Sequence, residues 1–148
     1  MEGKYTKTGT IVGIVAVLIT VWQINKNKSS EFQGEWIMTS EIQDSQMSNY
    51  IGMNIEWVLH ITQNGQELEG TGEKIKVNNI KLNYIERTNL RLKGSINGKQ
   101  FIINYIENGK QRQTSGIFKG QINENIFQGE FSQTAADSKG AIYGIKKK

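Results

Sequence analysis

Residues 55–72 read IEWVLHITQNGQELEGTG, and this stretch carries the pattern that decides the fold. Every second position from Ile55 to Ile61 is apolar, and a second alternating run follows the pair Asn64-Gly65. A period of two is typical of a strand that buries one face. Asn-Gly suits a tight type I′ turn, because both residues accept positive φ. The stretch therefore predicts an antiparallel hairpin.

The same pattern continues to the end of the chain. Further Asn-Gly pairs stand at 97–98 and 108–109, weaker turn signals stand at 78–79 and 123–125, and no segment with a helical period separates the runs. A meander of about eight strands tends to close on itself, since closure removes exposed strand edges. We expect residues 31–148 to form an all-β domain, a small antiparallel meander barrel of about eight strands.

Large apolar residues and glycines share the face that we expect to point into this barrel. Glycine inside a strand permits a sharp bend at a barrel corner or a close approach by another group. A barrel of about eight strands is wide enough to be filled by side chains or to hold one small ligand. The pattern leaves both a filled barrel and a cavity open. The expected inner-face glycines are Gly70, Gly72, Gly94, Gly120, Gly129 and Gly144, and the apolar positions include Phe32, Trp36, Leu82, Tyr84 and Tyr105.

An uncharged apolar run, GTIVGIVAVLITVW at residues 9–22, precedes the domain and has two lysines on each side. With its extension to Ile24 the run approaches the roughly 17 residues that a short membrane-spanning helix needs. It ends without the small residues of a signal-peptide cleavage site. Trp22 stands where an interfacial tryptophan would stand. We therefore expect an uncleaved single-pass transmembrane helix within residues 1–30, followed by the barrel domain.

Gly9 and Gly13 form a G-x-x-x-G pair within this run. Such glycines let two membrane helices approach closely, so the pair predicts self-association and a homo-oligomer. Glycine is also common in membrane helices without this role. The positive residues that mark the cytoplasmic side are nearly balanced across the run, so the flanks leave the side of the barrel undetermined.

The formal net charge of +4 is concentrated outside the domain. Residues 1–30 hold four lysines and one glutamate, a charge of +3, which leaves +1 for the rest. Arg87, Arg91 and Arg112 are the only arginines in the chain. A protein that grips long nucleic acid needs a broad basic face, so this class is excluded. A small anionic ligand needs only a few cations and is compatible with the composition.

Most residue types for catalysis and metal binding are missing. The chain has one histidine, His60, and no cysteine, so neither a transition-metal site nor a Ser-His-Asp triad is expected. A glycine-rich phosphate loop is also absent. Glu67 and Glu69 lie two apart on one strand face, but exposed glutamates on an outer face explain them better than catalytic carboxylates. We predict a protein that is not an enzyme and needs neither a metal nor a cofactor.

Three glycine-containing segments near the end of the chain resemble a known family. They are Lys119-Gly120-x-Ile122, Gly129-Glu130-Phe131-Ser132-x-Thr134 and Gly140-Ala141-Ile142. A glycine-aromatic strand, a hydroxyl and a final G-x-I strand resemble the closing strands of the transmembrane β-barrel effectors of bacterial anti-phage cyclic-oligonucleotide signalling (CBASS). The resemblance implies a cytoplasmic barrel that binds a cyclic nucleotide, and oligomerisation that damages the inner membrane. That family usually has two membrane helices, whereas this chain has one apolar run.

The pattern Gly34-x-Trp36, followed by hairpins, resembles the layout of lipocalins and avidins. In those barrels the tryptophan plugs one end, and lipocalins place an arginine from the last strand across it. Residues 142–146 of this chain contain no arginine. This resemblance implies a different class of function, an extracytoplasmic, membrane-anchored barrel that binds a hydrophobic ligand or a partner protein.

The first resemblance leads to a set of candidate ligand-binding residues. Aromatic rings stack on bases, cations pair with phosphates and hydroxyls donate hydrogen bonds. Residues 132–140 concentrate hydroxyl groups, one carboxylate and one lysine at the expected barrel rim. This segment fits an ordinary polar hairpin loop, and it also fits a binding loop, because rim loops commonly carry function. We expect a small anionic ligand and a bacterial inner-membrane protein, with the barrel on the cytoplasmic side favoured. The candidates are Trp36, Tyr105 and Tyr143 for stacking, Arg112 and Lys139 for phosphates, and Ser132 and Thr134 for hydrogen bonds.

Overall fold

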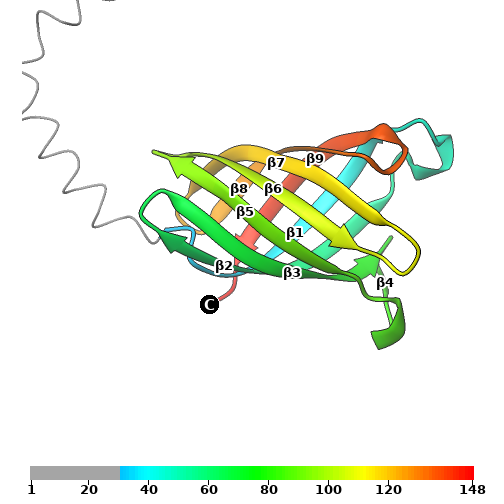
Figure 1. Cartoon of the computed structure of the whole chain (residues 1–148), viewed down its shortest axis with the longest axis horizontal. Coiled ribbons are helices and arrows are strands. Elements are labelled where there is room, and N and C mark those ends of the chain that lie inside the picture. Colours follow the sequence, from blue (N-terminus) through cyan, green and yellow to red (C-terminus); the bar gives the residue numbers. More distant parts are fainter. Residues whose placement is uncertain (1–30) are drawn as a thin grey trace, which may run out of the picture.

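The structure, a computed structural model, describes residues 31–148 as an all-β barrel (Figure 1). Its strands are β1 (Gly34–Asp44), β2 (Asn54–Asn64), β3 (Glu67–Val77), β4 (Ile80–Lys81), β5 (Asn89–Asn97), β6 (Gln100–Asn108), β7 (Gln113–Asn123), β8 (Ile126–Gln133) and β9 (Ser138–Lys146). Each long strand pairs antiparallel with the next long strand, and β1 pairs with both β2 and β9, which closes the sheet. The predicted closed antiparallel barrel is confirmed, with eight long strands and the short extra strand β4.

The expected membrane helix, with Gly9 and Gly13, falls in residues 1–30 and lies outside the described residues. Within residues 31–148, no helix has the length and apolar character needed to cross a bilayer. The helical segments of this part are three short 3₁₀ turns, η1 (Ser48–Tyr50), η2 (Tyr84–Glu86) and η3 (Ala135–Asp137).

The two ends of the barrel differ. At the closed end, two-residue turns join β2 to β3, β5 to β6 and β7 to β8, and the C-terminus lies there as well (Figure 1). At the open end, longer connections join β1 to β2, β3 to β5, β6 to β7 and β8 to β9. The hairpin predicted at Asn108-Gly109 is one of these longer loops, in which the Gly109 backbone N donates to the Arg112 carbonyl oxygen at 3.0 Å.

Two of the tight turns use glycine one position earlier than a type I′ turn requires. Their central residues are Gly65-Gln66 and Gly98-Lys99, and φ is +63° at Gly65 and +64° at Gly98. Positive φ at the first central residue alone is the pattern of a type II′ turn, so the predicted type I′ turns are wrong at both hairpins. Residues 78–79, a weaker signal in the sequence, have positive φ at both positions and join β3 to β4.

The segment between β4 and β5 departs from the predicted alternation. Tyr84 begins η2 and is 86% exposed, so the inner-facing strand predicted at Leu82 and Tyr84 is wrong. Asn83 and Glu86 form a capping box, in which each side chain accepts a hydrogen bond from the other residue's backbone N–H. These local hydrogen bonds stabilise a turn that leaves the sheet, which is why the alternating pair does not extend a strand.

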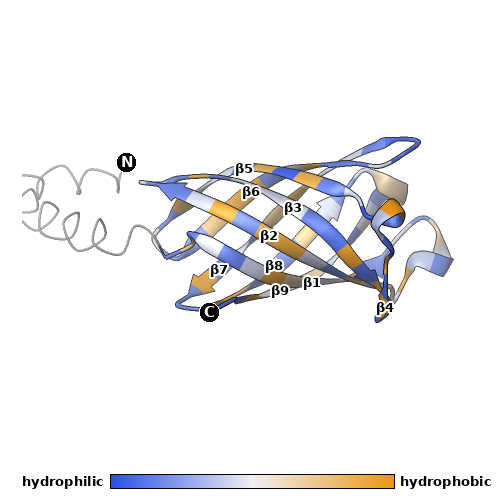
Figure 2. Cartoon of the chain, turned by 90° about the horizontal axis from the view of Figure 1, so that it is seen from below, coloured by the Kyte–Doolittle hydropathy of each residue, from blue (hydrophilic) through white to orange (hydrophobic). Residues whose placement is uncertain are grey.

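Aromatic side chains fill the closed end, and Figure 2 shows how hydrophobic and hydrophilic residues alternate along the strands that lead to it. Phe32 and Trp36 are fully buried with ring centroids 5.3 Å apart, and the Trp36 indole N–H donates to the Phe32 carbonyl at 2.9 Å. Phe101 and Phe127 pack on Phe32 with centroids 5.0 and 5.4 Å away. Lys146 Nζ lies 5.5 Å from the centroid of Trp36. This end of the barrel is therefore a packed core.

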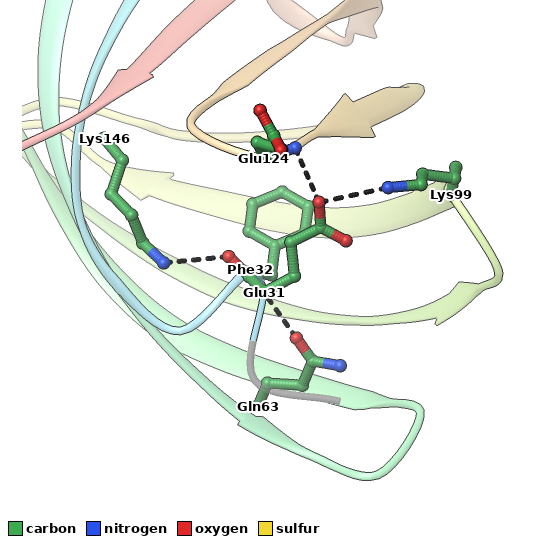
Figure 3. Close-up of polar contacts among 6 residues, drawn as sticks. All are labelled: Glu31, Phe32, Gln63, Lys99, Glu124 and Lys146. Atoms are coloured by element: carbon green, nitrogen blue, oxygen red, sulfur yellow. Dashed lines mark hydrogen bonds and ion pairs between the residues drawn. The ribbon is translucent and has the colours of Figure 1, made fainter. Parts of the chain in front are cut away.

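Glu31 fastens the chain to the closed end just before β1 (Figure 3). Its Oε2 accepts a hydrogen bond from the backbone N of Glu124 at 2.6 Å and lies 3.3 Å from Lys99 Nζ. Lys146 Nζ donates to the Glu31 carbonyl oxygen at 2.9 Å, and the next backbone N–H donates to Gln63 Oε1 at 2.9 Å. Contacts from two turns and two strands thus fix the point where the chain enters the barrel.

Gly120 on β7 and Gly129 on β8 are direct register partners on the inner face. A Cβ at Gly129 would collide with the Lys119 carbonyl oxygen, and a Cβ at Gly120 would collide with the Gln128 carbonyl oxygen. The two strands approach this closely because neither residue carries a side chain. At this wall the glycines therefore serve the close approach of the two strands.

Candidate ligand-binding site

The open end of the barrel contains a cavity of about 650 Å³, which we call the mouth cavity. Side chains from both halves of the sheet and from the loops after β6 and β8 line it. Its volume lies within the range of about 300–1,000 Å³ that is typical of small-molecule sites. The sequence left two interpretations of the inner face open, a filled barrel and a cavity. Each applies to one half of the barrel, because side chains fill the closed end and the open end is hollow.

An ion pair lies in the wall of the mouth cavity. Lys74 Nζ on β3 is 2.8 Å from Glu107 Oε2 on β6, and the two side chains are 19% and 12% exposed. Thr88 Oγ1 donates a hydrogen bond to the same carboxylate oxygen at 2.6 Å. Lys74 Nζ also lies 5.1 Å from the ring centroid of Trp57, within cation–π distance. A carboxylate and an aromatic ring therefore hold this cation in place.

Tyr105 and Phe118 form a stacked pair in the same wall, with centroids 4.2 Å apart and planes 16° from parallel. Tyr105 is buried, and its hydroxyl donates to Gln133 Oε1 at 2.8 Å. Burial, followed by the nearby Glu107 carboxylate, raises the pKa of the Tyr105 phenol well above its usual value. The phenol is therefore protonated at physiological pH and acts as a hydrogen-bond donor.

Positive charge predominates among the residues that line the mouth cavity. Lys110 and Arg112, both exposed, come from the loop between β6 and β7. Together with Lys74 they give three cations, against the single carboxylate of Glu107, so the lining has a net charge of +2. Buried aromatic rings below a cationic rim suit a ligand that has both a planar ring and an anionic group.

The structure separates the predicted ligand-binding residues. Tyr105 and Arg112 both line the mouth cavity, and the structure brings these two together. Trp36 is fully buried in the aromatic core of the closed end, at the opposite end of the barrel. Thr134 is exposed in the loop after β8, where its Oγ1 accepts a hydrogen bond from the Ser115 backbone N at 3.1 Å.

Three further candidates lie on the outer face of the barrel. Ser132 on β8 and Lys139 on β9 are direct register partners, and both are exposed. Tyr143 on β9 is 43% exposed and also points outward. Strand alternation explains these positions, because each of the three residues is out of phase with buried neighbours such as Phe131 and Ile142.

Sequence reasoning did not select Lys74, Glu107, Trp57 or Thr88 as site residues. The alternation of inward and outward positions along the strands could have identified the ion pair from the sequence. Lys74 continues the inward series of Leu68, and Glu107 continues that of Phe101 and Tyr105, so each places a charge on an inner face. A charged residue at an inward position near one end of a barrel indicates a polar cavity there, since a buried charge needs a partner.

Within residues 31–148, no three histidine, aspartate or glutamate side chains gather closely enough to hold a metal ion. No model of a known protein family matches the chain, and no curated protein matches it significantly. Among the described residues, the mouth cavity best supports a function, because it combines buried aromatic rings with a net charge of +2.

Proposed function

We propose that this protein is a membrane-anchored β-barrel receptor that binds a small cyclic nucleotide in the mouth cavity. Binding drives oligomerisation that disrupts the inner membrane in anti-phage defence. The observation that carries the proposal is a cavity of about 650 Å³ that combines buried aromatic rings with a net charge of +2. A cyclic nucleotide has the two matching features, planar bases and phosphate anions.

The phosphates are assigned to the rim. The Arg112 guanidinium can bind a phosphate through two parallel hydrogen bonds, and Lys110 adds a second positive charge beside it. Lys74 lies deeper, and the Glu107 carboxylate 2.8 Å away offsets its charge. The net attraction for an anion is therefore at the entrance, where a phosphate keeps part of its hydration.

The bases are assigned to the aromatic wall. Stacking of a base on an aromatic side chain contributes about 1–3 kcal/mol and tolerates any base. Polar groups beside the stacked rings of Tyr105 and Phe118 can read the base edges. Thr114 offers a hydroxyl, and Gln133 offers an amide that can both donate and accept hydrogen bonds.

Isothermal titration calorimetry of the full chain in detergent, against cyclic di- and trinucleotides, tests ligand binding. The double variant Lys110→Gln/Arg112→Gln should weaken binding by about ten- to a hundredfold, because a hydrogen bond to a charged group contributes about 1.5–3 kcal/mol. Arg91→Gln/Lys93→Gln is the matched control, since both residues are exposed on β5 and lie outside the cavity. Absence of binding heat with every cyclic nucleotide would refute the proposal.

Assembly is tested separately, with the ligand that gives binding heat. Sedimentation of the full chain should show larger oligomers after ligand addition, and lipid vesicles that contain it should then leak. Gly9→Ile/Gly13→Ile should weaken the assembly, because bulky side chains keep two helices apart. An oligomer whose size changes neither on ligand addition nor in this double variant would count against the proposed mechanism.

A second candidate function is an extracytoplasmic barrel for a hydrophobic ligand. Two observations favour it. Lys146 Nζ lies over the Trp36 ring, where lipocalins place an arginine, and Ile42 and Phe131 line an apolar part of the mouth cavity. A fluorescent fatty acid should bind if this function is correct. A reporter fused to the C-terminus separates the candidates, because the first requires a cytoplasmic barrel and the second requires an external one.

A further inference from the structure

A second hollow lies on the outer wall of the barrel, across strands β5 to β9. Its volume is about 930 Å³, and none of its lining residues also lines the mouth cavity. We call it the outer groove. Its lining includes Gly120 and Gly129, the register partners at which an added Cβ would collide with the backbone of the neighbouring strand. All of its lining residues lie on strands, so the groove is a feature of the sheet and not of a loop.

One wall of the outer groove is a row of four amide side chains that ends at a tyrosine; we call it the amide row. Successive register pairs join its members directly from β5 to β9, and all of them are exposed. Because neighbouring strands lie about 4.8 Å apart, the row presents a regular series of donors and acceptors across five strands. Its members are Asn97, Gln100, Gln121, Gln128 and Tyr143.

The outer groove has no net charge. Its charged lining residues are Lys119 and Glu130, which face each other as register partners on the opposite wall. At the β9 end of the amide row, Tyr143 exposes 43% of its surface. A tyrosine ring offers an apolar face for stacking and a hydroxyl for a hydrogen bond. A ligand for this surface is therefore neutral, rich in hydrogen-bonding groups and long enough to cross several strands.

We propose that the outer groove binds a neutral glycan chain, which lies across β5 to β9. Each sugar hydroxyl both donates and accepts a hydrogen bond, and each amide side chain can do the same. The amides of Gln121 and Gln128 face the middle of the chain, and Tyr143 stacks on a sugar ring at one end. This site is independent of the nucleotide proposal, because the two cavities share no lining residue.

Other classes of ligand fit the outer groove less well. Long nucleic acid needs several cations, and the groove has only Lys119, opposed by Glu130. A peptide that adds a strand needs a free sheet edge, whereas β5 to β9 are each paired on both sides. An apolar ligand would cover the amide row without satisfying its hydrogen bonds, which costs free energy.

Calorimetry of the full chain with neutral linear oligosaccharides tests the site, in a detergent without a sugar headgroup. The probes are oligomers of β-1,4-glucose, β-1,4-N-acetylglucosamine and α-1,4-glucose, and we expect saturable binding of at least one. Gln121→Ala/Gln128→Ala should lower its affinity by about tenfold or more, since each lost hydrogen bond contributes about 0.5–1.5 kcal/mol. Tyr143→Ala should also lower the affinity.

The matched control is Gln43→Ala/Gln66→Ala, because both glutamines are exposed and lie outside the groove. This control, and Lys110→Gln/Arg112→Gln at the mouth cavity, should leave oligosaccharide affinity unchanged. The proposal is overturned if no oligosaccharide binds to a chain whose circular dichroism shows a folded barrel. It is also overturned if Gln121→Ala/Gln128→Ala binds as tightly as the native chain.

Discussion

Lys74 and Glu107 form an ion pair between two strands that are not neighbours in the sheet, with 2.8 Å between Nζ and Oε2. Strand β5 lies between their strands, and Thr88, just before β5, donates to the same carboxylate. A buried ion pair is a weak source of stability, because the cost of removing two charges from water offsets their attraction. Its place in the wall of the mouth cavity fits a role in ligand recognition.

Lys74 and Glu107 should be energetically coupled, so that removal of both costs less stability than the two single removals added together. Lys74→Met leaves the Glu107 carboxylate with Thr88 alone, and Glu107→Leu leaves a half-buried amine. We expect each single change to lower the free energy of unfolding by about 1–3 kcal/mol, less than in fully buried pairs because both side chains keep some exposure. The double variant should lose less than the sum of the two. Urea unfolding followed by tryptophan fluorescence measures this, and strictly additive losses would contradict the coupling.

Alkaline pH should destabilise the barrel through Tyr105. Burial raises the pKa of its phenol above the ordinary 10.0, so above pH 10 the unfolded chain loses this proton while the folded barrel retains it. The folded state then binds more protons, so this group lowers the free energy of unfolding as pH rises above 10 and has no such effect well below it. Tyr105→Phe should flatten this fall in urea unfolding measured from about pH 8 to 11, and Tyr143→Phe should not. Identical profiles for Tyr105→Phe and the native chain would contradict the assignment.

Period-two alternation predicts most of the barrel, because inward and outward positions differ in polarity on nearly every long strand. It fails at Leu82 and Tyr84, since two alternating apolar residues do not distinguish a strand from a short capped turn. The competing signal was present in Asn83 and Glu86, which have the spacing of a capping box. The Asn-Gly pairs located the hairpins but did not predict the turn type. Asn64 and Asn97 are the last paired residues of their strands, so each glycine is the first central residue of its turn.

The mouth cavity was less accessible to sequence reasoning than the fold. Strand alternation alone places Lys74 and Glu107 on the inner face. Their contact, however, depends on how β3, β5 and β6 are staggered relative to one another. It also depends on a register shift between Glu56 and Trp57, where β3 has one extra residue. The outward positions of Ser132 and Lys139 follow from alternation, whereas their selection as candidates followed from residue type.

Lys146 should contribute to stability through its amine. Lys146→Met keeps most of the aliphatic chain but removes the hydrogen bond to the Glu31 carbonyl at 2.9 Å and the cation over Trp36. We expect the free energy of unfolding to fall by about 1–2 kcal/mol. The control is Lys147→Met, whose ion pair with Glu35 is largely exposed and should contribute less than about 0.5 kcal/mol. Equal losses in the two variants, measured by urea unfolding, would mean that the contacts of Lys146 have no special role.

Gly129→Ala should be among the most destabilising small substitutions in the barrel. The added Cβ would collide with the Lys119 carbonyl oxygen and come within 2.6 Å of Gly120 Cα, and both obstacles are backbone atoms. Because backbone cannot rotate away as a side chain does, β7 and β8 must separate, and we expect a loss of about 2–3 kcal/mol. Gly109→Ala is the control, since its Cβ would meet only the Arg112 carbonyl oxygen, at 3.0 Å. Urea unfolding of the two variants measures the difference. A Gly129→Ala barrel as stable as the Gly109→Ala barrel would show that the close approach of β7 and β8 does not depend on glycine.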